Sequence, residues 1–311
     1  MFPIRPGQYR HLQPQYQKVA PPDLTSGLDF SSDPGVYSNA RLKYIEAGLE
    51  PFSGELTDAH LVHFLKRTRF GATLEELRGL RGKSLDIIIS GSLASFTPFT
   101  EPVNNYNKVS ENKIDPDVPL GETFVQAKFN QEFEGDRIVA LKAWMIGRIL
   151  GPSSGIQEKM VLFWWNFLPI KMWQVFVAKS CYRYINMLHS NALGNFKTMI
   201  RDLTIDPAML VFLSGAFNNK ETPDENFARE LQELFCIGKG KDAGYKEQDV
   251  QSAARVLTGW TVNWESIHSN GEPESYFNPE MHHLGNKQFS SFYGNKVITG
   301  KACLLYTSRR G

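Results

Sequence analysis

Cysteine is scarce in this chain, and its spacing excludes two kinds of site. The 311 residues contain only three cysteines, Cys181, Cys236 and Cys303. Because they are far apart and odd in number, they form neither a disulfide framework nor the paired spacing of a structural zinc site. We expect Cys236 to be an inert core thiol at the end of a helix. A glycine-rich phosphate loop and the strand-to-helix turn of a nucleophile elbow are also missing, so no common catalytic motif identifies a reaction.

An excess of charge of either sign is absent as well. Lys plus Arg number 34 and Asp plus Glu number 33, which gives a formal net charge of +1 and a pI of about 7.7. A nearly neutral chain has no overall electrostatic attraction to nucleic acid, so we expect no nucleic-acid partner. The densest basic stretch, 67–83, is typical of solvated helix faces.

No hydrophobic run reaches the roughly 18 residues that a membrane-spanning helix needs. The nearest stretch is 160–177, which Asn166, Pro169 and Lys171 interrupt. We therefore expect no membrane span, and two core helices that meet at Pro169 rather than a helix lying in a membrane interface. The first residues of the chain lack the apolar segment of a signal peptide, which in our interpretation favours the cytoplasm over the periplasm.

The hydrophobic residues that are present make up 41% of the chain, enough for a sizeable core. Residues 1–54 are rich in Pro, Gln, Tyr and Gly without a lasting period, and they predict an irregular N-terminal arm. Residues 55–302 predict a helical domain. Within residues 303–311, the run 303–308 matches one reading frame of a sequencing-library adapter. We interpret the whole of 303–311 as a non-native tail, and the domain as incomplete at its C-terminal end.

Helical periodicity dominates the domain, so the predicted fold class is mainly α, an orthogonal multi-helix bundle. Strand patterns occur only after residue 260, at 261–264 and 275–277, and they predict one small β-hairpin around a turn at 269–271. The predicted helices cover 57–67, 74–90, 124–150 with a break near Gly135, 156–167, 171–188, 191–203 and 207–214, with two more inside 222–260.

The first helix inside 222–260 has clear start and stop signals. Thr222 and Glu225 predict a capping box, with Pro223 at the first helical position, and Gly238 predicts a left-handed stop. Arg229 lies one turn after Glu225. The expected apolar stripe consists of Phe227, Leu231, Leu234 and Phe235. The adjoining flank carries Asn226, Glu230 and Glu233.

The second helix is predicted from Glu247 to Trp260, with Gly259 at its exit. Asp249 lies in its first turn, where the helix dipole favours a negative charge. Arg255 points nearly opposite the buried face. That buried face is expected to contain Val250, Ala253, Val256, Leu257 and Trp260.

Residues 224–260, which we call the signature, resemble the pattern of a bacterial family known as domain of unknown function 1800. The matching positions are Asp224 to Leu231, Glu233, Leu234, Gly238, Tyr245, Asp249, Val250, Ala254, Arg255 and Leu257 to Trp260. Shorter matches lie at 63–71, 192–196 and 206–210, and His282, Gly285 and Lys287 match a downstream run. The resemblance covers roughly 57–302, and the long block is its specific part.

One departure from the family pattern is important for the candidate site. Where the family usually shows Trp-His-Asn-His-Phe, this chain has Trp164, Trp165, Asn166 and Phe167. Two imidazoles two residues apart are attractive metal ligands. Because Trp165 and Phe167 stand in their positions, this chain lacks that histidine pair.

The signature and the downstream run supply the candidate site. In an extended segment neighbouring side chains point to opposite faces, so only one residue of the His282–His283 pair faces the helices, and the resemblance favours His282. Candidate acid/base residues are Glu230, Glu233 and His282. Candidate ligands for a divalent cation are Glu230, Glu233, Asp249 and His282, with His63 and His189 as weaker additions. Candidate binding residues are Asn226, Arg229, Asp249, Arg255, Trp260 and Lys287.

A structural interpretation of the same charges stays open. In it, Arg229 brackets Glu225 and Glu233 one turn away on each side, while Glu230 pairs with another helix. Buried carboxylates need such compensation, because an unpaired buried charge destabilises a fold by several kcal/mol.

Two functional classes remain. The first is a scaffold or interaction protein, and the resemblance implies a sulfatase-like partner because family members are often encoded beside a sulfatase-like family. The second is a hydrolase or metal-assisted enzyme that uses the Glu/Asp/His cluster. Geometry separates the two classes: the enzyme requires these side chains to line an open cleft, whereas the scaffold requires them to be paired and closed off.

Overall fold

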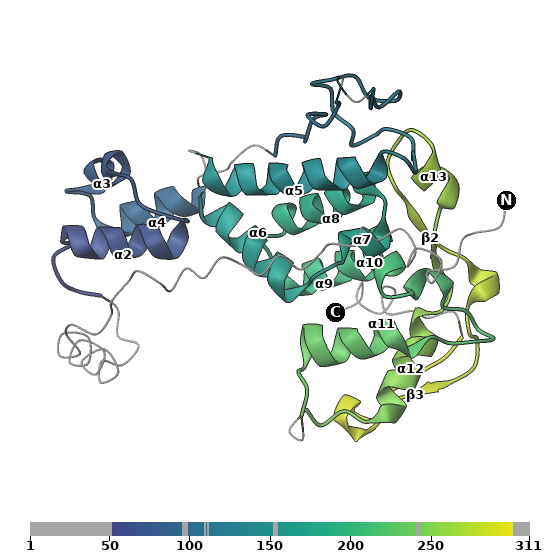
Figure 1. Ribbon diagram of the computed structural model, residues 1–311. Coiled ribbons are helices and arrows are strands. Elements are labelled where there is room, and N and C mark those ends of the chain that lie inside the picture. The colour runs from purple at the N-terminus through teal and green to yellow at the C-terminus, as the bar shows by residue number, and fades with distance from the viewer. Residues whose placement is uncertain are drawn as a thin grey trace, which may run out of the picture.

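The computed structural model describes residues 52–94, 99–108, 110, 112–151, 155–240 and 243–300. The predicted tail and nearly all of the predicted N-terminal arm lie outside these residues. The described part is mainly helical, with two small antiparallel hairpins, which confirms the predicted fold class (Figure 1). None of the described helices is both long enough and apolar enough to cross a membrane.

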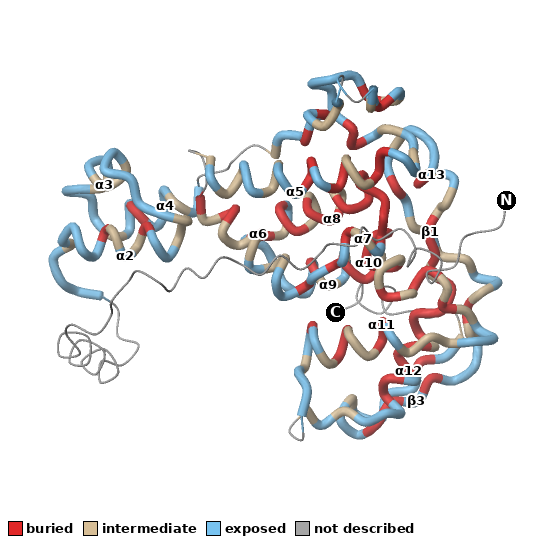
Figure 2. Tube along the Cα trace, in the orientation of Figure 1, coloured by how far each residue is buried: buried red, intermediate tan, exposed pale blue. Residues whose placement is uncertain are grey.

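Three helices form a group beside the main bundle (Figure 1). They are α2 (Asp58–Thr68), α3 (Leu74–Leu80) and α4 (Leu85–Ala94). The single helix predicted over 74–90 was wrong, because Gly82, at φ +75°, turns the chain between α3 and α4. Few residues are buried in this group (Figure 2), and the buried residues of its three helices are Leu61, Leu65 and Ile88.

The main bundle is built around one buried helix. Its helices are α5 (Glu134–Leu150), α6 (Ile156–Phe167), α7 (Met172–Val175), α8 (Ala178–Ser190), α9 (Phe196–Thr204) and α10 (Pro207–Phe212). Figure 2 shows α8 as largely buried, with α5 and α6 against it. The helix predicted over 171–188 divides into α7 and α8, because Phe176 adopts a left-handed conformation at φ +53°. The helix predicted over 124–150 begins only at Glu134, and Gly135 lies in its first turn instead of breaking it.

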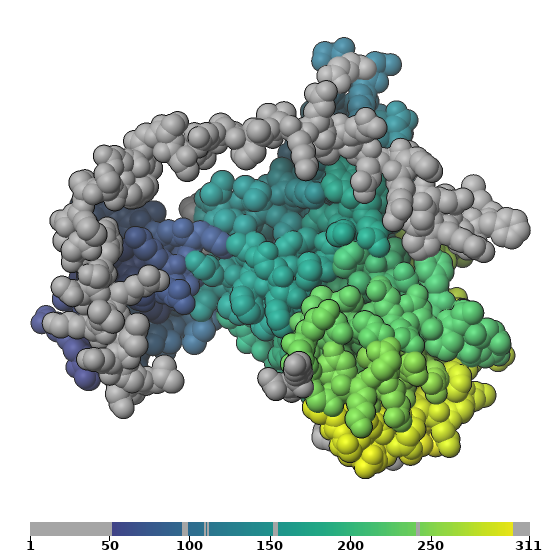
Figure 3. Space-filling view, turned by 60° about the horizontal axis from the view of Figure 1, so that its bottom comes forward, coloured from purple at the N-terminus to yellow at the C-terminus, as the bar shows by residue number. Residues whose placement is uncertain are grey.

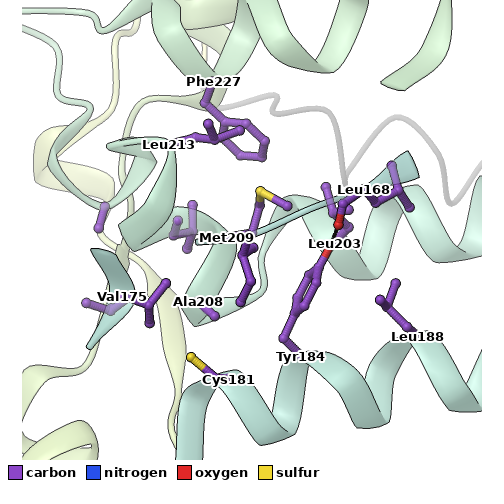
Figure 4. Close-up of a cluster of buried hydrophobic side chains, with 14 of the residues drawn as sticks. Leu168, Val175, Cys181, Tyr184, Leu188, Leu203, Ala208, Met209, Leu213 and Phe227 are labelled. Atoms are coloured by element: carbon purple, nitrogen blue, oxygen red, sulfur yellow. Dashed lines mark hydrogen bonds between the residues drawn. The ribbon is translucent and has the colours of Figure 1, made fainter. Parts of the chain in front are cut away.

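The core of the bundle joins α8 to the signature. Tyr184 is fully buried, and its hydroxyl donates a hydrogen bond to the Leu168 carbonyl at 2.5 Å. Met209 of α10 and Phe227 of the signature lie in the same apolar cluster (Figure 4). Burying a side chain of this size stabilises a fold by about 1.5–3 kcal/mol, so the signature is packed into the bundle and not merely attached to it.

The first signature helix consists of α11 (Glu225–Glu230) and a following π-helix, η4 (Leu231–Cys236). Its cap is Asp224, whose carboxylate accepts a hydrogen bond from the Asn226 amide at 2.8 Å. The predicted cap at Thr222 was therefore wrong; the Thr222 hydroxyl instead accepts a hydrogen bond from Asn219. Gly238 has the positive φ that was predicted, at +107°.

The π-helix changes which side chains face the core. Its hydrogen bonds span one residue more than those of an α-helix, so the 3.6-residue period no longer holds beyond Glu230. Leu234, predicted to lie in the apolar stripe, is 53% exposed, while Gln232 is buried. Cys236, predicted to be a core thiol, is exposed for the same reason.

The second signature helix, α12 (Glu247–Leu257), ends before Trp260. Val250, Ala253, Val256 and Leu257 are buried as predicted. Trp260 is not part of the helix but opens strand β1 (Trp260–Val262). Gly259, at φ +92°, makes this change of direction possible, because a Cβ atom there would lie 2.8 Å from the Asn278 carbonyl oxygen.

The C-terminal part consists of short elements around α12. Strand β1 pairs antiparallel with β2 (Ser275–Phe277), and Trp260 lies opposite Phe277. Between them lies α13 (Trp264–His268), so the predicted hairpin carries a helix in its connection. A second hairpin joins β3 (Lys287–Gln288) to β4 (Val297–Ile298). Short 3₁₀ turns are η3 (Gly215–Phe217), η5 (Pro279–Met281) and η6 (Ser291–Tyr293). Figure 3 shows these green to yellow parts as one lobe beside the bundle.

Candidate functional site

The two signature helices run antiparallel. Near the end of the first, the Arg229 Nη1 atom donates to Glu247 at the start of α12, at 2.8 Å. Before the first helix begins, the Asn218 side chain donates to the Ala254 carbonyl near the end of α12, at 2.9 Å. The start and the end of α12 therefore contact different parts of the chain. Because a helix rises 1.5 Å per residue, Asp249 and Thr258 are separated by roughly 13 Å along its axis.

Asp249 holds the C-terminal lobe to the start of α12. Its side chain is fully buried, and one carboxylate oxygen accepts the Ser290 amide at 2.7 Å. The other oxygen accepts the Ser290 hydroxyl and the Lys246 amide, both at 2.7 Å. Burial raises the pKa of Asp249. These hydrogen bonds and the Lys246 charge lower it by more than burial raises it, so the pKa of Asp249 lies below its usual range. We call this group the Asp249 clamp.

His282 forms a second clamp at the other end of α12. Its side chain is 1% exposed, and its Nδ1 atom lies 2.7 Å from the Thr258 carbonyl oxygen. Since a carbonyl only accepts, Nδ1 carries the proton, and Nε2 accepts a hydrogen bond from the Lys287 ammonium at 3.2 Å. Lys287 also donates to the Gly300 carbonyl at 2.8 Å. Burial and the Lys287 charge hold the pKa of His282 below its usual value, so the imidazole is neutral.

The four candidate metal ligands do not meet in one place. Asp249 and His282 belong to clamps at opposite ends of α12. Among the residues that the structure describes, no three His, Cys, Asp or Glu side chains are grouped so that they hold a metal ion. The acid/base and metal roles of Glu230, Glu233 and His282 therefore stay predictions, without a shared site in the described part.

The charges of the first signature helix are mostly paired at the surface. Arg229 pairs with Glu225 one turn before it, at 2.9 Å, as the structural interpretation expects. Its second partner is Glu247 of α12 and not Glu233. Glu233 lies 3.6 Å from the ammonium of Lys239. Of these pairs, the one between Arg229 and Glu247 connects α11 to α12.

Glu230 is different from its neighbours. Its Oε2 atom is buried, and among the described residues it has no hydrogen-bond partner. The predicted pairing of Glu230 with another helix is therefore not seen there. Arg255 is half-buried and likewise makes no side-chain hydrogen bond or ion pair with a described residue. Asn226, by contrast, donates to the Leu213 carbonyl at 3.1 Å, and Trp260 packs on Phe277 at 5.7 Å.

Gln232 was missed by the sequence analysis. Its Oε1 atom accepts a hydrogen bond from the Tyr293 hydroxyl at 2.8 Å, and its amide donates to the Ala228 carbonyl at 3.1 Å. This bond ties the π-helix to the same lobe that the Asp249 clamp holds. No sequence signal predicts it, because helical spacing places Gln232 away from the core.

Arg137 was missed as well. It is 1% exposed and donates to both carboxylate oxygens of Asp115, at 2.9 and 3.0 Å, and to Glu134 at 2.9 Å. The second oxygen of Glu134 accepts the Ala178 amide at 2.6 Å. This buried network fastens the loop before α5 to the start of α8. A sequence shows only a charged pair three residues apart, which is typical of a solvated helix face.

The remaining predicted positions are scattered. His189 is buried with its Nε2 atom 3.5 Å from Glu158, far along the chain from the signature, and His63 is exposed on α2. Trp165 packs edge-on against Tyr184 at 5.9 Å. Phe167 is 40% exposed. The two positions that replace the family's histidines thus differ, one packing on the core and the other facing outward.

Comparison with known proteins identifies one family. No curated protein and no solved structure gives a significant match to the chain. A family model described as "Protein of unknown function (DUF1800)" matches residues 63–302, which include the signature and both clamps. The matched region extends from α2 to just beyond β4. The chain therefore belongs to the DUF1800 family.

Proposed function

We propose that this chain is a helical scaffold that binds a protein partner, and that the polar residues of its signature hold the scaffold together. The observation that carries the proposal is the closure of the two clamps. Asp249 and His282 are at most 1% exposed, and protein groups take up both carboxylate oxygens and both ring nitrogens. An enzyme that used these side chains would need them open to a substrate.

An exposed aromatic surface on α6 and α9 supplies a place for the partner. Phe163, Phe167 and Phe196 are 52%, 40% and 37% exposed, and we call them the aromatic surface. Phe163 and Phe167 lie one helical turn apart and stack at 6.2 Å, while Phe196 lies 6.3 Å from Phe167. Aromatic side chains dominate the binding energy of many protein interfaces, and grouped exposed rings are typical of such surfaces.

The partner that we propose is a sulfatase-like protein. The support is the family resemblance, because members are often encoded beside a sulfatase-like family. The near balance of Lys and Arg against Asp and Glu, 34 to 33, supports a protein partner over nucleic acid.

Binding of the full-length chain to the sulfatase-like protein encoded beside it tests this proposal. We expect Phe163→Ser with Phe167→Ser to weaken binding at least about tenfold in calorimetry, because two ring anchors are removed. Val139→Ser is the matched control, since Val139 is 51% exposed on α5 and lies outside the aromatic surface. Absence of binding by the unaltered chain, or equal binding by both variants, contradicts the proposal.

A metal-assisted enzyme is the second candidate, and Glu230 is the observation that favours it. A buried carboxylate oxygen without a partner in the described residues is the kind of group that a cation satisfies. Under this alternative Glu230 and Glu233 supply oxygen ligands, as the sequence predicted.

Thermal unfolding with and without Mg²⁺, Mn²⁺, Ca²⁺ and Zn²⁺ decides between the two. A specific site stabilises the folded state by about 2.7 kcal/mol at a hundred times its Kd. The enzyme alternative predicts a rise in Tm that Glu230→Gln abolishes and that Glu265→Gln, on the exposed start of α13, retains. The scaffold proposal predicts the same Tm with and without each ion.

A further inference from the structure

One cavity that neither clamp explains lies away from the signature. A cavity of about 670 Å³ opens between α8, α9, the start of α10 and the start of β2. This size is within the usual range for a small-molecule site. The charged side chains that line it are Arg183, Asp202, Asp206 and Glu274. We call it the polar cleft. Its residues take no part in either clamp or in the aromatic surface.

Asp206 is a buried residue that uses only one of its two carboxyl oxygens to cap a helix. It is 5% exposed, and its Oδ1 atom caps α10 by accepting the Ala208 and Met209 amides at 2.9 and 3.2 Å. Its Oδ2 atom forms no hydrogen bond with any described residue. Burial raises the pKa of Asp206 to about 7, although the two amides and the Arg183 charge act in the opposite direction. The Oδ2 atom of Asp206 is therefore left for a ligand in the cleft.

Arg183 faces Asp206 with donors that are also unused. It is half-buried, and its guanidinium makes no hydrogen bond or ion pair with a described residue. A guanidinium only donates and a carboxylate only accepts. The cleft thus presents both donors and an acceptor, and the two groups do not bond to each other. A charged side chain in this position is stable only if water or a ligand satisfies it.

The remaining lining is mixed in the same way. Asp202 accepts a hydrogen bond from the Asn191 amide at 3.2 Å, and Glu274 lies exposed at the rim. Apolar atoms of Met187, Ile205 and Pro207 complete the wall. The cleft therefore offers acceptors, donors and a small apolar surface together.

This combination excludes simple ions as the best ligand. A metal ion requires grouped ligands, and the described residues contain no such group. An anion is repelled by Asp202, Asp206 and Glu274, and a cation held by these acids leaves the donors of Arg183 unsatisfied. A hydroxyl group, in contrast, donates and accepts at once, so it satisfies a carboxylate and a guanidinium on neighbouring atoms. We propose that the polar cleft binds a neutral polyhydroxyl ligand, namely a sugar, with Asp206 and Arg183 as its main hydrogen-bonding residues.

Saturation-transfer NMR and calorimetry on the full chain test this proposal. The probes are methyl glucoside, methyl galactoside, N-acetylglucosamine and cellobiose, with spermidine, inorganic phosphate and Mg²⁺ as charged comparisons. We expect at least one of the saccharides to bind. Asp206→Asn keeps an N-cap residue but converts the free acceptor to a donor, and Arg183→Gln removes the charge. Each is expected to weaken binding about tenfold to a hundredfold.

Matched controls separate a binding role from a folding role. Asp224→Asn makes the same exchange at the cap of α11, and Arg78→Gln removes an exposed arginine of α3; both are expected to leave binding unchanged. If Asp206→Asn lowers Tm strongly, Arg183→Gln alone decides. The proposal is overturned if no saccharide binds, if both cleft variants bind as the unaltered chain does, or if one of the charged probes binds more tightly than every saccharide. Loss of the sulfatase-like partner affects none of these outcomes.

Discussion

Two buried aspartates at the starts of helices behave in opposite ways. Asp249 of α12 has both carboxylate oxygens filled by Ser290 and Lys246, and its pKa lies below the usual range. Asp206 before α10 has only one oxygen filled, and its pKa is raised to about 7. Burial disfavours the charge in both cases. At Asp249 the hydrogen bonds from Ser290 and Lys246 and the Lys246 charge outweigh burial, whereas at Asp206 burial outweighs its two amide hydrogen bonds and the Arg183 charge. Asp249 therefore has a structural role, whereas Asp206 keeps one carboxyl oxygen with which to bind a ligand.

The comparison extends to the surroundings of each residue. The signature stands out in the sequence, yet its buried polar side chains are mostly occupied by each other and by the lobe that they hold. The polar cleft has no such pattern beyond a short match at 206–210, yet it leaves the Oδ2 atom of Asp206 and the guanidinium of Arg183 without hydrogen-bond partners among the described residues. A conspicuous motif therefore reports on how the chain folds as readily as on a site.

The largest expected effect is the loss of the Asp249 clamp. Asp249→Ala leaves two backbone amides and a hydroxyl buried without acceptors, so we expect the free energy of unfolding to fall by about 3–5 kcal/mol in urea denaturation. Asp86→Ala is the control, because Asp86 also lies in a first helical turn but is exposed, and its loss is expected to cost about 0.5 kcal/mol. Equal losses in the two variants contradict the clamp.

The pH dependence of stability sharpens the contrast between the two aspartates. A depressed pKa gives stability that is present above about pH 4 and lost as pH falls below it, so the advantage of Asp249 over its Asp249→Asn variant is steady near neutral pH. A raised pKa has the opposite effect, because the stability that the group contributes is lost as pH rises. The advantage of Asp206 over its Asp206→Asn variant is expected to decrease between about pH 4 and about pH 7, by up to about 4 kcal/mol.

Chemical denaturation of the parent chain, Asp249→Asn and Asp206→Asn at several pH values measures both slopes. If the stability difference from the parent chain changes with pH in the same direction for both variants, the contrast between the two aspartates is contradicted. A flat difference for Asp206→Asn indicates that its carboxyl group ionises as freely as in the unfolded chain.

The smallest effect is expected for Arg229. Its pairs with Glu225 and Glu247 are partly exposed, and such pairs contribute about 0–1 kcal/mol. Arg229→Ala is therefore expected to lower the free energy of unfolding by less than about 1 kcal/mol, with a weaker effect at high salt. A loss as large as that of Asp249→Ala means that Arg229, and not the clamp, carries the connection between the signature helices.

Much of the fold follows from helical spacing and cap residues. The periodicity of α6, α8 and α12 and the order of the helices were predictable because each buries one stripe against the bundle. The predicted pattern failed where the backbone leaves ordinary geometry. Phe176 and Gly82 turn the chain at positive φ, and the π-helix beginning at Leu231 shifts the buried face. Periodicity assumes regular geometry, so it does not foresee these changes.

The candidate site was predictable only as separate residues. Alternation in an extended segment predicts that only one of His282 and His283 faces inward, and the resemblance favours His282, which is 1% exposed. The separation of Asp249 from His282 was not foreseen, because it depends on which ends of α12 the C-terminal lobe contacts. Arg137 and Asp206 were missed for a related reason. Their importance comes from partners that lie far away in the sequence or from partners that are missing, and neither is visible in a local pattern.

The most direct test of the account is the imidazole of His282 in the full-length chain, observed by ¹⁵N-resolved NMR across pH. If the signature is a set of closed clamps, the Nδ1 proton exchanges slowly with water and the ring stays neutral until the pH falls clearly below 6.5, the ordinary value for histidine. A His282 ring that exchanges rapidly and titrates near 6.5 is open to solvent, and that result contradicts the account.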